Sequence, residues 1–161
     1  DSDFLLKNLK SYIAMKNAIV KKDPFEKKKI RYLLNFGHTV GHIFESEMLW
    51  PHGISILFGI IFAIHFSLRK KILAKSEAKA ILQKIHSSVF NKDLEQLLRE
   101  AFIISEDDVT EKLVQDKKTT GKKVNFIFLK KRGQAVVKPV LGSELIAVFK
   151  DLKNKESYFD V

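Results

Sequence analysis

Apolar residues recur three or four positions apart through most of the chain, and this period predicts a mainly helical protein. The first such segment carries Leu5, Leu9 and Ile13 and follows Ser2, a residue type that caps helix N-termini. The longest apolar stretch covers residues 54–68 and contains one histidine and two serines. It is shorter than the roughly 20 residues that cross a membrane. We therefore expect residues 54–68 to form a central helix buried on most sides.

Turn and capping residues divide the rest of the chain into further short helices. Asp23-Pro24 predicts a turn, Pro51 ends a helix, and Ser76, Asn91 and Ser105 are candidate N-caps. The helices predicted between these signals cover residues 25–34, 39–49, 77–86, 92–102, 109–114 and 143–153. We expect residues 154–161 to fray.

One late interval departs from the helical period. Residues 124–129 and 135–137 are rich in β-branched and aromatic side chains, and the basic segment between them contains Gly133. This pattern predicts a β-hairpin. The predicted fold is therefore a mainly α, multihelical array with one late hairpin, forming a single domain over residues 1–161.

Composition limits the chemistry. The 161 residues include no Cys, which excludes a disulfide scaffold, a Cys-ligated metal and a Cys nucleophile, and fits a reducing cytoplasm. The net charge of +10 favours anionic partners. The basic runs at residues 27–29, 69–71 and 130–132 are interpreted as solvated faces, although they also support a rival hypothesis, a nucleic-acid-binding module. That rival lacks a helix-turn-helix signature.

Histidines are concentrated in one part of the chain. His38 and His42 lie four residues apart, so both imidazoles face one side of a helix, and Glu45 can share that face. His52 follows the break at Pro51, where a helical return could bring it opposite His38. Neutral imidazoles suit a divalent metal, and spacing alone permits all three to bind. The glycines beside these histidines would allow close approach of a ligand. His65 is interpreted as a hydrogen-bonded core residue and His86 as a solvated one.

The same region carries a longer motif. Residues 31–42, RYLLNFGHTVGH, resemble the R-x-x-L-N-x-G-H-T-x-G-H motif of 3-dehydroquinate synthases. Three further segments resemble that family in the same order: Lys16 to Glu26, His52-Gly53 with the apolar helix after it, and Asp116-Lys117-Lys118 with the β-rich stretch that follows.

The resemblance implies a carboxy-terminal helical domain that packs on an amino-terminal NAD-binding domain, in an enzyme that is a cytoplasmic homodimer. That enzyme converts 3-deoxy-D-arabino-heptulosonate 7-phosphate to 3-dehydroquinate and phosphate, using NAD and a divalent metal, usually zinc. By the same resemblance, His38 and His52 are metal ligands, His42 and Glu26 are catalytic, and the substrate is held by Lys16, Arg31, Asn35 and Lys117.

The sequence also departs from the family pattern. Ile54 and Ile60 stand where the family has Glu and Met, and Glu26 lies five residues before Arg31 where the family usually has four. The family's third metal ligand is a Glu in a segment ahead of residue 1. We therefore expect the chain to be part of something longer, inactive alone and weak in metal binding. A different sugar-phosphate cyclase of the same fold is an alternative, and a metal-dependent alcohol dehydrogenase is a more distant one.

Overall fold

The computed structural model describes residues 2–89, 96, 98, 100, 123–155, 157–159 and 161. The chain divides into two compact units, Asp1–Asn35 and Phe36–Val161, which are described separately here. The prediction of one domain over residues 1–161 stays a prediction. The helices predicted at 92–102 and 109–114 lie outside the described residues, apart from helical positions 96, 98 and 100.

The first unit contains one long helix and one short helix. α1 covers Ser2–Lys22, as its apolar period predicted, and the 3-10 helix η1 covers Arg31–Asn35. The prediction of a helix over residues 25–34 is wrong for its first six residues. Asp23 is buried, and its carboxylate accepts hydrogen bonds from the backbone N–H groups of Lys28, Ile30 and Arg31 at 3.0, 2.9 and 3.3 Å. These bonds fix a loop instead of a helix.

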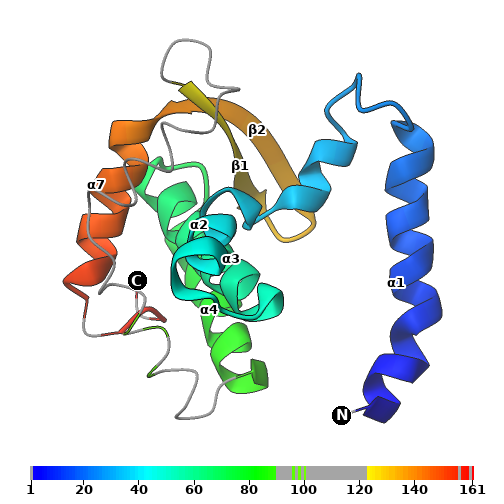
Figure 1. Cartoon of the computed structure of the whole chain (residues 1–161), viewed down its shortest axis with the longest axis horizontal. Coiled ribbons are helices and arrows are strands. Elements are labelled where there is room, and N and C mark those ends of the chain that lie inside the picture. The colour runs from blue at the N-terminus through cyan, green and yellow to red at the C-terminus, as the bar shows by residue number, and fades with distance from the viewer. Residues whose placement is uncertain are drawn as a thin grey trace. The chain divides into compact units, whose positions relative to one another are not determined.

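The second unit is a helical array with one hairpin (Figure 1). Its elements are α2 His38–Met48, α3 His52–Arg69, α4 Lys75–Val89, β1 Lys123–Lys131, β2 Gln134–Leu141 and α7 Gly142–Lys153. The predicted fold class, a helical array with a late hairpin, is confirmed. Ser76 is not the N-cap of α4, because the N–H of Ala78 already bonds the carbonyl of Ala74 at 3.0 Å.

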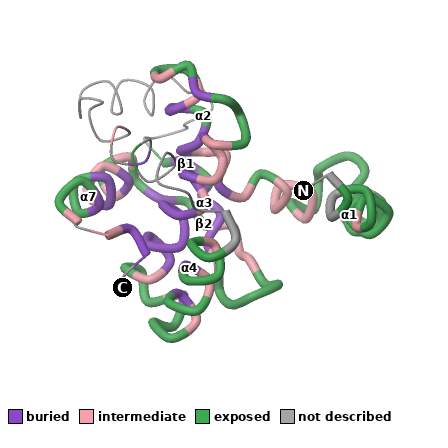
Figure 2. The backbone as a smooth tube through the Cα atoms, turned by 90° about the horizontal axis from the view of Figure 1, so that it is seen from below, coloured by how far each residue is buried: buried purple, intermediate pink, exposed green. Residues whose placement is uncertain are grey.

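α3 forms the centre of the core. Ten of its 18 residues are buried, among them Phe58, Phe62 and Phe66 (Figure 2). α3 is long and apolar enough to cross a membrane by length and composition. Its burial inside the unit confirms instead the prediction of a buried central helix.

The hairpin packs on α3 through aromatic rings. β1 and β2 pair antiparallel, with Phe126 opposite Lys138 and Phe128 opposite Val136. The rings of Phe126 and Phe128 lie with their centroids 5.1 and 4.9 Å from that of Phe66. The backbone N–H of Leu129 donates to the Ser67 hydroxyl at 2.9 Å. The hairpin is therefore held to the core helix by apolar burial and by a satisfied polar contact.

The prediction that residues 154–161 fray is wrong for the described part of that segment. Tyr158 and Phe159 are buried, and the Nε2–H of His65 donates to the backbone carbonyl of Tyr158 at 2.7 Å. The Phe159 ring lies 4.9 Å from that of His86. Two large aromatic side chains repay the ordering of this short segment.

Candidate metal and substrate site

Three glycines set the distance between α2 and α3. A Cβ placed on Gly59 would lie 1.9 Å from the carbonyl oxygen of Gly37 and 2.9 Å from the backbone nitrogen of Gly41. A Cβ on Gly41 would lie 2.8 Å from the carbonyl oxygen of Ser55. The glycines therefore serve the approach of two backbones, whereas the sequence interpretation linked Gly37 and Gly41 to the approach of a ligand.

Gly37 has a second role at the start of α2. It precedes His38 as the N-cap residue and has a φ of 84°, which a residue with a side chain rarely adopts. This conformation turns the chain into α2, so that His38 becomes the first residue of the helix.

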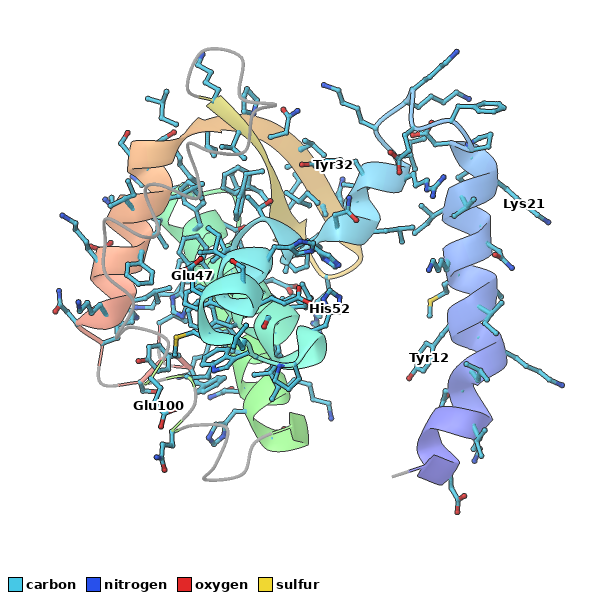
Figure 3. All side chains as sticks on the ribbon, viewed as in Figure 1. Tyr12, Lys21, Tyr32, Glu47, His52 and Glu100 are labelled. Carbon is cyan, nitrogen blue, oxygen red and sulfur yellow. The ribbon has the colours of Figure 1, made fainter. Side chains whose placement is uncertain are left out.

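The close helix pair brings the three histidines together. The ring centroids are 5.3 Å apart for His38 and His42, 5.5 Å for His38 and His52, and 5.9 Å for His42 and His52. His38 is half-buried, and His42 and His52 are exposed. His52 is labelled at the start of α3 in Figure 3. The predicted return of His52 toward His38 is confirmed by these distances.

Two of the three rings are oriented through Nδ1. The Nδ1 of His52 lies 3.0 Å from Oε2 of Glu45, and the Nδ1 of His38 lies 3.3 Å from the backbone carbonyl oxygen of Phe36. Because a carbonyl and a carboxylate can only accept, Nδ1 is the donor in both rings, and in the neutral form of each ring the lone pair lies on Nε2. Among the described residues, neither ring nitrogen of His42 has a hydrogen-bond partner.

Glu45 interacts with the histidine cluster. The sequence placed it on the helix face of His38 and His42 but gave it no role. The hydrogen bond from His52 holds the pKa of the Glu45 carboxyl below its ordinary value, and the nearby charges of His52, His42 and His38 act in the same direction. Ligand atoms of His42, Glu45 and His52 also lie within 4.8 Å of one another. The structure thus offers two possible donor sets, His38 with His52, and His42 with Glu45 and His52.

The other predicted site residues belong to the first unit or lie outside the described residues. Lys16 is exposed on α1, and Asn35 is exposed at the end of η1. Glu26 forms an ion pair with Arg31, with Nε and Oε1 3.1 Å apart. Lys117 lies outside the described residues. The structure therefore groups the three histidines, while the joining of the other five residues to them stays a prediction.

His65 and Asp23 are buried polar residues with structural roles. Burial lowers the pKa of His65 to about 4, which keeps the ring neutral, and the prediction of a hydrogen-bonded core histidine is confirmed. The sequence marked Asp23 only as part of a turn and of the family motif. The Asp23-Pro24 pair was the available sequence signal for its role as a loop anchor.

Comparison with known proteins gives one family and several relatives. The family model described as 3-dehydroquinate synthase C-terminal matches residues 1–119. The 3-dehydroquinate synthase of Campylobacter concisus is 33% identical over 145 residues, which cover 86% of this chain and 39% of that protein. The 3-dehydroquinate synthase of Thermoanaerobacter pseudethanolicus is 29% identical, with 93% and 41% covered. The chain thus spans about two fifths of the length of these curated relatives.

A solved structure shares the fold. It is a 2-deoxy-scyllo-inosose synthase complexed with carbaglucose-6-phosphate, NAD+ and Co2+, and it aligns with a TM-score of 0.63 at 21% sequence identity. The alignment covers 86% of this chain and 38% of that one. At this identity the likeness establishes the fold alone.

Proposed function

The chain belongs to the 3-dehydroquinate synthase C-terminal family, and from this premise we propose that it is the metal- and substrate-binding part of a 3-dehydroquinate synthase. In this proposal the complete enzyme converts 3-deoxy-D-arabino-heptulosonate 7-phosphate to 3-dehydroquinate and phosphate, as a step of the shikimate pathway. The amino-terminal domain supplies the NAD site. The complex of the 2-deoxy-scyllo-inosose synthase with NAD+ supports a nicotinamide cofactor in this fold.

One observation carries the metal part of the proposal: His38 and His52 both have Nδ1 engaged and Nε2 available. A histidine that ligates through one nitrogen almost always donates from the other to a carboxylate or a carbonyl. Glu45 and the Phe36 carbonyl are such partners. His38 and His52 therefore fit a divalent metal, with zinc as the proposed ion, and the Co2+ bound to the 2-deoxy-scyllo-inosose synthase supports this class of ligand. When bound, the ion would act as a Lewis acid toward substrate hydroxyls.

His42 is the proposed proton-transfer residue. Its ring is exposed and lies 5.3 Å from His38 and 5.9 Å from His52, centroid to centroid. Without a hydrogen-bond partner among the described residues, it is free to hold or release a proton beside a substrate. This difference from its two neighbours supports the division of roles that the family pattern implies.

Residues of the first unit, together with Lys117, are the proposed substrate clamps. The substrate carries a phosphate and a carboxylate, for which Lys16, Arg31 and Lys117 are suitable partners, and Asn35 can donate to an oxygen anion. Glu26 is the proposed catalytic carboxylate. Its ion pair with Arg31 would have to open or be shared when Arg31 binds substrate.

The amino-terminal NAD-binding domain is the proposed partner of the chain. Within the first unit, α1 exposes Leu6, Leu9 and Ile13 by 68%, 48% and 50%. Tyr12 and Lys21 project from opposite sides of this helix (Figure 3). An apolar stripe on an otherwise basic helix is typical of a surface that packs on another domain. A homodimer of the complete enzyme and a cytoplasmic location remain part of the proposal.

The test is reconstitution. The chain is joined to the amino-terminal part of the Campylobacter concisus relative, and phosphate release from 3-deoxy-D-arabino-heptulosonate 7-phosphate is measured with NAD and zinc. We expect turnover from the joined protein and none from the chain alone. Turnover by the chain alone, or none by the joined protein when both parts are folded, would contradict the proposal.

Single substitutions in the joined protein test the roles of the histidines. His38→Ala and His52→Ala should remove metal and turnover together, while His42→Ala should slow turnover and leave the metal bound. His86→Gln, outside the cluster, is the matched control and should change neither. Loss of metal from the His42 and His52 variants, with metal retained by His38→Ala, would favour the His42, Glu45 and His52 donor set. Equal loss of metal from all three cluster variants would show that the division of roles is wrong.

Two alternative functions have distinct readouts. Another sugar-phosphate cyclase, favoured by the shared fold with 2-deoxy-scyllo-inosose synthase, would release phosphate from a different sugar phosphate. A nucleic-acid-binding module, favoured by the net charge of +10, would bind duplex DNA with an affinity that falls steeply with salt.

A further inference from the structure

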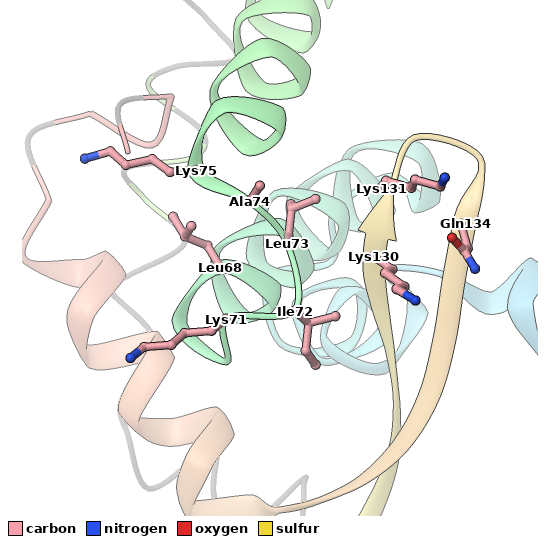
Figure 4. Close-up of a pocket in the computed structure, with 9 residues that line it drawn as sticks. All are labelled: Leu68, Lys71, Ile72, Leu73, Ala74, Lys75, Lys130, Lys131 and Gln134. Atoms are coloured by element: carbon pink, nitrogen blue, oxygen red, sulfur yellow. The ribbon is translucent and has the colours of Figure 1, made fainter.

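Two basic runs that lie 61 residues apart in the sequence border one pocket in the folded chain. Residues 69–71 end α3, and residues 130–132 form the tip of the hairpin. Both runs contribute to the lining of one pocket of about 580 Å³. Figure 4 shows Lys130, Lys131 and Gln134 on the hairpin, Lys71 on the turn between α3 and α4, and Lys75 at the start of α4.

The cations around the pocket form two groups, those that have an ion-pair partner and those that line the pocket. Arg69 pairs with Asp151, Lys70 pairs with Glu144, and the Arg132 Nε lies 3.3 Å from Oε2 of Glu77. The cations that line the pocket have no ion-pair partner among the described residues: Lys71, Lys75, Lys130 and Lys131. None of the nine lining residues is acidic. The pocket therefore has a positive potential that its own walls do not neutralise.

A β-bulge places both hairpin lysines at the pocket. Neighbouring residues of a regular strand point to opposite faces, so Lys130 and Lys131 would normally be separated. The pairing of β1 with β2 shifts between Leu129 and Lys131, which interrupts the alternation, and both lysines line the pocket. An irregularity of this kind re-aims side chains at the edge of a sheet.

The remaining walls are apolar. Leu73 is buried, and Leu68 and Ile72 are half-buried against the core, so the pocket presents aliphatic surface beside its ammonium groups. Figure 4 shows the side chains of Ile72 and Leu73 between the hairpin lysines and the Lys71 and Lys75 side chains, which extend away from the hairpin. A volume of about 580 Å³ suits a small molecule.

We propose that this pocket binds a small phosphorylated ligand with an aromatic or aliphatic body. The phosphate lies against Lys130, Lys131 and the Gln134 amide, and the body covers the half-buried Ile72. Lys71 and Lys75 contribute less, because their ammonium groups lie on the outer side of the turn. The pocket is remote from the histidines: along α3, His52 and Leu68 are separated by roughly 24 Å at 1.5 Å per residue. The ligand would therefore be a second one, additional to the proposed substrate.

The probe for the test is 1-naphthyl phosphate, which combines a phosphate with an aromatic body. Its fluorescence polarisation is followed as the full 161-residue chain is added. We expect saturable binding, at least tenfold tighter than that of inorganic phosphate in competition and at least tenfold tighter than that of 1-naphthol. Displacement by inorganic phosphate at equal concentration would overturn the proposal, since charge alone would then account for binding.

Matched double variants locate the site. Lys130→Gln with Lys131→Gln should weaken binding at least tenfold, and Lys71→Gln with Lys75→Gln about threefold. Lys79→Gln with Lys138→Gln removes the same charge from exposed positions on α4 and β2 outside the pocket, and should change binding less than twofold. All six lysines are exposed, so each variant should keep the parent circular dichroism spectrum. Equal weakening by all three pairs, or tighter binding of an oligonucleotide than of the probe with equal sensitivity to all three pairs, would overturn the proposal.

Discussion

Substitution of Gly59 by Ala should separate α2 from α3 and disturb the histidine cluster from a distance. Gly59 lies two turns along α3 from His52 and touches no histidine ring. The added Cβ would lie 1.9 Å from the carbonyl oxygen of Gly37, where ordinary contact begins at 3.4 Å. The obstructing atom is backbone, so a side-chain rotation cannot relieve the clash, and one helix must move by about 1.5 Å.

The change in the free energy of unfolding of Gly59→Ala follows from two opposing effects. Overpacking of a well-packed core costs typically 1–3 kcal/mol. We expect the upper value, about 3 kcal/mol, because the clashing atom is backbone and cannot rotate away. Ala is a better helix former than Gly by about 1 kcal/mol, which offsets part of the loss. The expected net destabilisation is the difference between these effects, about 2 kcal/mol. The contact between Phe44 and Phe58, with ring centroids 4.2 Å apart, should also loosen as the helices separate.

Gly53→Ala is the matched control in the same helix. A Cβ at residue 53 would meet nothing within 4 Å, so this variant should be neutral or more stable by up to about 1 kcal/mol. Urea unfolding followed by circular dichroism measures both variants, and metal content of the joined protein measures the effect on the cluster. If Gly59→Ala is as stable as Gly53→Ala and keeps its metal, the glycine contact does not set the helix distance.

Three further predictions address individual side chains. Glu45→Gln in the joined protein should weaken metal binding 10- to 100-fold through loss of the carboxylate that orients His52, whereas Glu47→Gln should change it less than twofold, as measured by metal titration. Burial lowers the pKa of His65 to about 4, so the unfolded chain takes up a proton first as the pH falls. Keeping His65 neutral contributes about 3 kcal/mol to the free energy of unfolding, and this contribution should be intact above pH 6.5 and lost between pH 6.5 and 4. Urea unfolding of His65→Gln should show a smaller decline of the unfolding free energy over that range. Asp23→Asn should speed hydrogen exchange of the three backbone N–H groups that donate to the Asp23 carboxylate, those of Lys28, Ile30 and Arg31. Unchanged exchange at these groups would exclude the loop-anchor role.

The elements that the sequence predicted well are those whose apolar pattern matches their burial. The apolar run at residues 54–68 lies in the buried α3, and the β-branched and aromatic run at residues 124–129 lies in β1, where most of it is buried. Residues 25–30 were predicted wrongly as helix, since their helical period competes with a carboxylate that accepts hydrogen bonds from three backbone N–H groups. Such a bond from Asp23 across up to eight residues leaves no trace in hydropathy.

The site was predictable in its residue types and only partly in its construction. Four-residue spacing put His38 and His42 on one face, and Pro51 indicated the return of His52. The packing role of the glycines could not be predicted, because it depends on which backbone faces Gly59 across the helix pair. Likewise, sequence placed Glu45 near the cluster but could not show which of the three rings it would orient.

The construction of the histidine cluster has a consequence for how a complete metal site would arise. The three rings, Glu45 and the glycine contact all belong to α2 and α3, so the cluster is assembled within one unit and needs no residue from the other. Two rings already have Nδ1 engaged, so the entropy of orienting them is lost on folding and not on binding. A further ligand from the rest of the enzyme would therefore add its own donor to a prearranged pair. The expected gain in metal affinity comes from ligand number, with no rearrangement of α2 and α3 required.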